Sequence, residues 1–174
     1  VFGIPILAWR FMRKHYLRGD LWSPTVQMRW SFLYKGYTSQ FYFWEVIVIA
    51  RKIVVVFIIV FLSDATEARM QSMTAVILMV VALALQVYAS PFKGAIFNVL
   101  EFGSLSTSLF TFSVGQYLDM PGMSENSLVA ISMLIALVNI AYMLFAGIVF
   151  LKLGSESFIT SLVARFQRWN ILPN

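Results

Sequence analysis

The residues best placed to do chemistry are four charged side chains inside apolar segments. Glu45, Arg51 and Lys52 stand in one such segment, and Glu101 stands in another. A charge in hydrocarbon is costly unless it is paired, so these residues indicate ion pairs, a proton or ion path, or charges that sense a membrane potential. We hypothesise that they form one intramembrane charge cluster with a net charge near zero.

Other kinds of site chemistry lack the residues that they need. The chain has no cysteine, and its one histidine, His15, stands among cations without a second metal-ligating neighbour. No phosphate-binding loop and no metal-ligand spacing is present in the sequence. The sequence therefore predicts no catalytic residue, no cofactor, no metal site and no enzymatic activity.

Composition indicates that the elements holding these charges lie in a membrane. Hydrophobic residues make up 60% of the 174 residues and charged residues 12%. Several apolar runs approach or exceed the roughly 20 residues that cross a bilayer as a helix. The sequence predicts an all-α integral membrane protein, a helical bundle of about four complete spans. These spans are expected near residues 41–63, 70–89, 96–118 and 127–153.

The remaining segments are expected to flank these spans. Residues 1–12 are interpreted as the end of a preceding span, and residues 13–40 as a cytoplasmic loop rich in basic and aromatic residues. Residues 155–172 have the spacing of an amphipathic helix that lies in the membrane interface. We expect a single membrane domain over residues 1–174 that forms the C-terminal part of a longer chain.

The charges of the loops orient the predicted bundle. Lysine and arginine concentrate on the side that holds the 13–40 loop, the turn near Lys93 and the C-terminus, whereas the opposite loops are acidic. By the positive-inside rule the basic side is cytoplasmic, so the net charge of +5 does not call for a nucleic-acid partner. The alternatives for the basic residues are contact with anionic lipid headgroups and a simple influence on topology. The candidate headgroup contacts are Arg10, Arg13, Lys14, Arg18, Arg165 and Arg168.

Depth along the helices limits which charges can meet. Counted from the cytoplasmic side, Arg51 lies about 12–15 Å into the membrane and Glu101 about 7–8 Å. A long cation that points back towards the cytoplasm can therefore reach Glu101. The alternative is that the helix begins later, so that Arg51 and Lys52 both extend to the headgroups.

Small and polar residues in the last two predicted spans indicate contacts between helices. A stripe of small residues at every fourth position allows another helix to approach closely; it comprises Gly103, Thr107, Thr111 and Gly115. A polar channel lining is the alternative interpretation of this helix. Asn139, near mid-membrane, fits an interhelical hydrogen bond better than a transport site. Partner transmembrane helices or other subunits are therefore expected.

One group of residues resembles a known family. The group comprises Leu33, Tyr34, Gly36, Tyr37, Trp44, Glu45, Arg51 and Lys52, followed by Pro91, Asn98 and Glu101. In this order the residues resemble the C-terminal multispanning membrane domain of large surface proteins of protists and algae, which is similar to TRP-like and polycystin-related membrane families. The resemblance covers residues from about 29 to 118. It implies a large extracellular region before this domain and a location in the plasma or ciliary membrane.

The chain differs from the channel members of those families in the segment between its last two predicted spans, where a channel has its pore. A pore helix and filter between the last two spans would take tens of residues, and residues 118–127 are too few. The favoured interpretation is a structural membrane domain that anchors a large cell-surface protein and assembles with partner helices. Two alternatives stay open. One is a pore-less subunit or sensor module of a TRP- or polycystin-like cation channel, with Arg51 and Lys52 as field-sensing charges, and the other is a transporter protomer.

Overall fold

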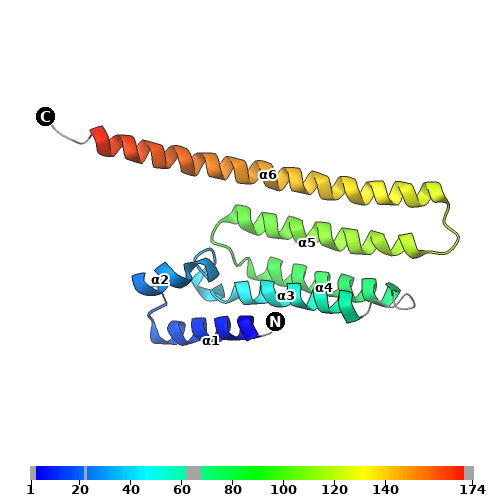
Figure 1. The fold of residues 1–174 in the computed structure, drawn as a ribbon, viewed down its shortest axis with the longest axis horizontal. Helices are drawn as coiled ribbons and strands as arrows, with labels where there is room; N and C mark the ends of the chain where they lie inside the picture. The colour runs from blue at the N-terminus through cyan, green and yellow to red at the C-terminus, as the bar shows by residue number, and fades with distance from the viewer. Residues whose placement is uncertain (1–2, 22, 62–67, 171–174) are drawn as a thin grey trace. The chain divides into compact units, whose positions relative to one another are not determined.

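The computed structural model describes the backbone of residues 3–21, 23–61 and 68–170, and most side chains as far as Glu156. Most of these residues are helical and none of them forms a strand, which confirms the predicted all-α class (Figure 1). The contacts divide the chain into residues 1–135 and 136–174, where the sequence predicts one domain. The helices are α1 (Gly3–Arg18), α2 (Pro24–Trp30), α3 (Trp44–Phe61), α4 (Ala68–Ala89), α5 (Ala95–Gly115) and α6 (Glu125–Asn170), with short 3-10 helices at Ser31–Leu33, Ser39–Phe41 and Gln116–Asp119.

Three helices in the described part of the chain are long and apolar enough to cross a membrane. They cover Met70–Ala89, Ala95–Leu118 and Glu125–Glu156, which match three of the four predicted spans and are consistent with an integral membrane protein. α3 is shorter, with 18 residues, and it contains three charged side chains. Its second half nevertheless exposes mainly apolar side chains. α3 thus has the surface of a membrane helix but a charge content that sets it apart.

The segment predicted as the 13–40 loop contains more helix than expected. α1 continues through the basic cluster to Arg18, and α2 begins at Pro24. Proline is favoured at the first position of a helix because its missing N–H has no intrahelical partner there and its φ is already helical. Ser23 therefore precedes a helix that Pro24 begins, and the segment between the predicted spans is largely helical, while its cytoplasmic position stays a prediction.

α6 is one continuous helix of 46 residues. The sequence predicts a span that ends near Leu153 and a separate interfacial helix over residues 155–172, with Gly154 between them. A single glycine costs a helix only about 1 kcal/mol, so it does not end one by itself. At about 1.5 Å per residue α6 is about 69 Å long, against a hydrocarbon thickness of about 30 Å. α6 is therefore more than long enough for a single crossing of the hydrocarbon. The side chains that would form the amphipathic face fall outside the described ones.

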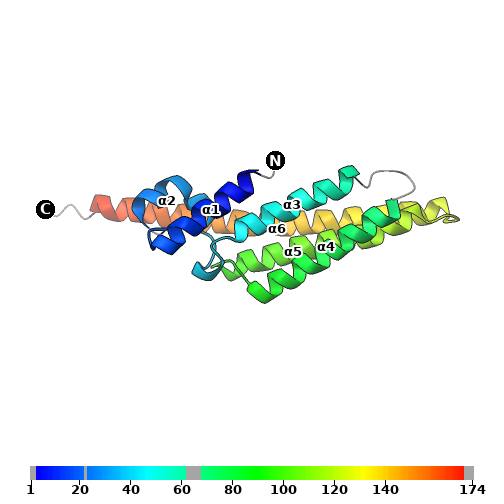
Figure 2. The ribbon, with the colours of Figure 1, turned by 90° about the horizontal axis from the view of Figure 1, so that it is seen from below.

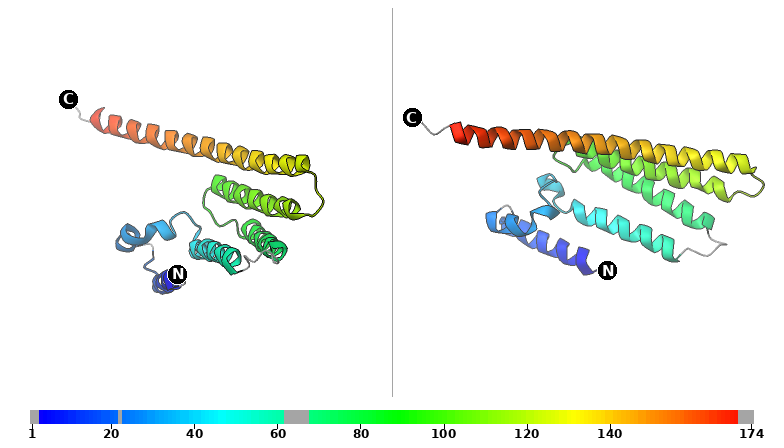
Figure 3. Two further views of the ribbon diagram at one scale, coloured as in Figure 1. Left: turned by 45° about the vertical axis from the view of Figure 1, so that its right-hand side comes forward. Right: turned by 45° about the horizontal axis from the view of Figure 1, so that its top comes forward.

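In residues 1–135 the long helices pack side by side in chain order. α1 contacts α3, α3 contacts α4, and α4 makes its most extensive contact with α5 (Figures 2 and 3). The turn at residues 90–94 joins α4 directly to α5, so these two helices run antiparallel.

A small core forms where α1 meets the segment that leads into α3. Its buried residues are Met12, Leu21, Leu33, Tyr34 and Tyr42. The hydroxyl of the fully buried Tyr34 donates a hydrogen bond of 2.7 Å to the carbonyl oxygen of Leu21. The ring of Tyr42 stacks on that of Tyr16 in α1, with 4.3 Å between the ring centroids. This core sets the direction in which the chain enters α3.

The turn before α3 is tied to the turn between α4 and α5. Residues 36–38 pair with residues 91–93 through two backbone hydrogen bonds, 2.9 and 3.0 Å long. Tyr37 and Phe92 form an isolated antiparallel bridge, and their ring centroids lie 4.8 Å apart. We call this pairing the turn bridge. It brings together two turns that the charge pattern assigns to the same side of the membrane.

Tyr34→Phe would remove the buried hydroxyl and leave the Leu21 carbonyl without its donor. We expect the free energy of unfolding to fall by about 1–3 kcal/mol, the cost of an unsatisfied buried polar group. Denaturant unfolding of the protein in detergent micelles, followed by tryptophan fluorescence, measures this change. Tyr16→Phe is the matched control because Tyr16 is 44% exposed and phenylalanine keeps its ring. Equal losses in the two variants would contradict the assignment.

Candidate functional site

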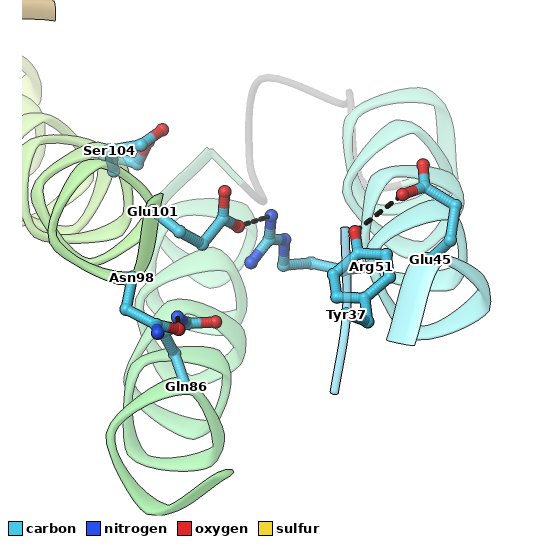
Figure 4. Close-up of polar contacts among 8 residues, drawn as sticks. Tyr37, Glu45, Arg51, Gln86, Asn98, Glu101 and Ser104 are labelled. Atoms are coloured by element: carbon cyan, nitrogen blue, oxygen red, sulfur yellow. Dashed lines mark hydrogen bonds and ion pairs between the residues drawn. The ribbon is translucent and has the colours of Figure 1, made fainter. Parts of the chain in front are cut away.

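An ion pair joins α3 to α5 (Figure 4). Nη2 of Arg51 donates a hydrogen bond of 2.6 Å to Oε1 of Glu101, and the two side chains are only 17% and 20% exposed. A charge-assisted hydrogen bond of this length is strong, and removal of either partner leaves an uncompensated charge. The pair therefore ties two helices that are separated along the chain by α4.

Helix geometry explains why these two positions meet. Arg51 comes seven residues after the start of α3 at Trp44, and Glu101 comes six residues after the start of α5 at Ala95. At about 1.5 Å per residue these separations are about 10 and about 9 Å along the two helix axes. Because the turn bridge pairs the segments before both helices, the helices start at one level and their charges reach the same depth.

Tyr37 binds the other carboxylate of the predicted cluster, which is half-buried. Its hydroxyl donates a hydrogen bond of 2.7 Å to Oε2 of Glu45, and its side chain is buried. Burial and then this hydrogen bond raise the pKa of Tyr37 well above its ordinary value. The charges of Glu45 and Glu101 add to the rise, and that of Arg51 opposes it. The phenol thus stays neutral and keeps its proton as the donor.

A third set of polar contacts closes the turn between α4 and α5. The side-chain amide of Asn98 donates to the carbonyl oxygen of Phe92 at 2.9 Å and accepts from the backbone N–H of Phe92 at 3.1 Å. The same Asn98 oxygen accepts a hydrogen bond of 3.2 Å from Nε2 of Gln86, a buried side chain of α4. We call the following set the polar junction: Tyr37, Glu45, Arg51, Gln86, Asn98 and Glu101 (Figure 4).

The structure divides the predicted charge cluster. It pairs Arg51 with Glu101, but the partner of Glu45 is a tyrosine, and Lys52 lies on the exposed surface of α3. Consecutive helical residues are turned by about 100° about the axis, so Lys52 cannot share the direction of Arg51. The single cluster of four charges is corrected to one ion pair and a separate hydrogen bond between a tyrosine and a glutamate.

Sequence reasoning did not identify Tyr37, Gln86 and Asn98 as site residues. For Gln86 and Asn98 a signal was present, since each is a polar residue near the end of an apolar helix and the two helices share one turn. For Tyr37 no comparable signal exists. Its partnership depends on the turn bridge, which joins segments more than 50 residues apart.

The small residues predicted to contact another helix are half-buried. They are Gly103, Thr107, Thr111 and Gly115. Among the described residues, nothing lies within 4 Å of the place that a Cβ on Gly115 would occupy. Asn139 of α6 is also half-buried. There is room for a partner helix at the end of this stripe, and its close approach stays a prediction.

The basic residues of α1 are exposed. They are Arg10, Arg13, Lys14 and Arg18. The guanidinium of Arg13 lies over the ring of Trp9, 5.1 Å from the ring centroid. The side chains of Arg165 and Arg168 lie outside the described ones. Contact of all these residues with lipid headgroups stays a prediction.

The polar junction is suited chemically to holding helices and turns together. Each of its carboxylates accepts a short hydrogen bond from a donor on another segment. In the part of the chain that the structure describes, no three histidine, aspartate or glutamate side chains gather in a way that could hold a metal ion.

Comparison of the chain with protein-family models, with curated proteins and with solved structures found no match. The resemblance to TRP-like and polycystin-related families therefore stays an expectation from the sequence.

Arg51→Met would leave Glu101 without its cation. We expect the free energy of unfolding to fall by about 3–5 kcal/mol, because a buried charge loses its partner. The double variant Arg51→Met/Glu101→Met should recover most of this loss, since two apolar side chains then replace the pair. Denaturant titration of the four proteins of this double-mutant cycle in micelles measures the coupling.

Lys52→Met is the matched control for this cycle, because Lys52 is adjacent in sequence and exposed. We expect it to change the free energy of unfolding by no more than about 0.5 kcal/mol. A loss as large as that of Arg51→Met, or additive losses in the double variant, would show that the ion pair does not hold the bundle.

The raised pKa of Tyr37 makes its contribution to stability depend on pH. In the unfolded chain a tyrosine ionises near pH 10, whereas folded Tyr37 stays neutral there. Its contribution is therefore complete below about pH 10 and is lost as the pH rises further. We expect the unfolding free energy of Tyr37→Phe to decline less steeply between about pH 10 and 12 than that of the parent protein. Tyr88→Phe, which removes an exposed hydroxyl, is the control, and identical slopes in all three proteins would contradict the expectation.

Proposed function

We propose that this chain is a non-enzymatic membrane domain that anchors a larger cell-surface protein and assembles with partner transmembrane helices. The observation that carries the proposal is the internal pairing in the polar junction: Arg51 with Glu101, and Glu45 with Tyr37. Conduction and transport need sites that bind an ion weakly enough to release it again. A carboxylate that already accepts a short hydrogen bond is poorly suited to that task, so the pairing supports a static bundle.

The apolar surface of the helices also supports a membrane domain. α4 exposes large apolar side chains along its length: Ile77, Val80, Val81, Leu85 and Val87. A water-soluble domain rarely exposes a contiguous surface of this kind. Lipid chains and partner helices are the surroundings that suit it.

The proposal includes four complete spans and a cytoplasmic C-terminus. α3 is counted as a span together with α4, α5 and α6, because Glu101 neutralises Arg51 within the bundle. Lys35 and Lys93 lie together at one end of the turn bridge, where Nζ of Lys93 donates a hydrogen bond of 3.1 Å to the carbonyl oxygen of Lys35. Under the positive-inside rule this end belongs in the cytoplasm. Four crossings from that side return the C-terminus to the cytoplasm.

A pore-less subunit or sensor module of a cation channel is the second candidate. The exposed position of Lys52 on α3 favours it, since a cation at mid-helix can respond to a membrane potential. It ranks second because a voltage-sensing helix carries several movable charges, and Arg51 is held by Glu101. A transporter protomer has less support, because Glu45 and Glu101 both already hold donors.

The variants Glu101→Gln and Lys52→Met separate these candidates in cells. An anchor whose assembly depends on the ion pair should lose several-fold of its assembled surface protein in Glu101→Gln and almost none in Lys52→Met. Surface labelling and native gels measure assembly, and whole-cell currents are recorded in parallel and normalised to the amount of surface protein. A current that depends on the protein and disappears in Lys52→Met at equal surface amount would overturn the anchor and favour the sensor module.

A further inference from the structure

An apolar groove lies between α1 and α3. Its volume is about 420 Å³, and it is lined by Ile6 and Trp9 of α1 and by six apolar residues between Phe43 and Val54. Every lining side chain is apolar. The volume falls within the range of about 300–1,000 Å³ that is typical of small-molecule sites. None of the residues that form the polar junction contributes to this lining.

One end of the groove is basic. α1 and α3 run antiparallel, since Tyr16 near the end of α1 stacks on Tyr42 just before α3 (Figure 1). Arg13 follows Trp9 by four residues, so both lie on one face of α1, and the guanidinium covers the Trp9 ring at 5.1 Å. The cation thus stands at the end of the groove that lies towards the start of α3. Arg10 and Lys14 are exposed at neighbouring positions and add positive charge there.

The length of the groove indicates what occupies it. From Phe43 to Val54 the lining extends over eleven residue steps, or about 16 Å at about 1.5 Å per residue. One leaflet of the hydrocarbon core is about 15 Å thick, half of the bilayer core. A partner helix that crosses the membrane would need a surface about twice as long. An acyl chain in one leaflet, with its headgroup at the basic end, matches both the length and the charge.

We propose that the groove between α1 and α3 binds one phospholipid with an anionic headgroup. Its acyl chain lies along the apolar lining, and its phosphate contacts Arg13, with Arg10 and Lys14 in support. Arg13 supplies planar N–H donors that suit a phosphate, and its stacking on Trp9 holds the guanidinium at the mouth of the groove. The site is independent of the anchoring function proposed above, since a channel subunit would contain it as well.

The test uses quenching of Trp9 by brominated lipids in the full chain, reconstituted in phosphatidylcholine nanodiscs. Brominated phosphatidylglycerol is added at increasing mole fraction, and brominated phosphatidylcholine is the neutral comparison. The variant Trp9→Phe separates the Trp9 signal from that of the other four of the five tryptophans. We expect Trp9 to be quenched at about fivefold lower mole fraction of the anionic lipid, the factor that corresponds to about 1 kcal/mol for one cation near an anionic surface.

Two sets of variants test the headgroup contact and the groove separately. Arg13→Gln should abolish the preference for the anionic lipid, whereas Arg13→Lys and Lys152→Gln, which removes an exposed cation of α6, should keep it. Ala50→Phe fills the groove and should raise the mole fraction needed for quenching by either lipid, whereas the conservative Ala50→Ser should not. Unfolding curves in the same nanodiscs establish that each variant is folded.

Three results would overturn the proposal. Equal quenching of Trp9 by both brominated lipids in the parent protein would mean that the groove holds bulk lipid without selection. Protection of Trp9 from both lipids would mean that a protein segment covers the groove. If folded Ala50→Phe needs the same mole fraction of the anionic lipid for quenching as the parent protein, the headgroup binds the basic residues without any chain in the groove.

Discussion

Arg51, a cation of α3 that is only 17% exposed, needs a counter-charge, and the arrangement of α3, α4 and α5 depends on that requirement. Left alone near mid-membrane, Arg51 would cost at least about 2.5–3.5 kcal/mol. Glu101 provides the counter-charge, but only if α3 and α5 start at the same level. The turn bridge supplies that condition, because it joins the segments that precede the two helices. The ion pair between α3 and α5 thus depends on the backbone hydrogen bonds that join the turns before these two helices.

Two neutral side chains, those of Asn98 and Tyr37, stabilise the turns before α3 and α5. Asn98 both donates to and accepts from the backbone of Phe92, in the manner of a neighbouring strand, so the turn keeps its shape without a longer sheet. Tyr37 takes part in the turn bridge through its backbone and holds Glu45 through its hydroxyl. Tyr37 therefore belongs both to the turn bridge and to the polar junction, so that the two support one another.

The helical membrane class and three of the spans were predictable because long apolar runs have few alternatives in structure. The contact between Arg51 and Glu101 could be predicted from the sequence, because the depth of a residue along its helix follows from the residue count. The partner of Glu45 was not, because it depends on a pairing between distant turns. The continuity of α6 was also missed, because a lone glycine is a weak helix breaker whose effect the neighbouring residues decide.

The separation of 50 residues between Arg51 and Glu101 has a consequence for biosynthesis. At about 5–20 residues per second, a ribosome needs about 3–10 s to make the segment between them. Throughout that interval α3 exists with its cation and without its counter-ion. With α3 as a membrane span, as proposed above, the nascent helix stays beside water or within the insertion machinery until the α4–α5 hairpin is complete. Under that proposal three helices enter the membrane together, and the synthesis of α5 is the step after which α3 can enter it.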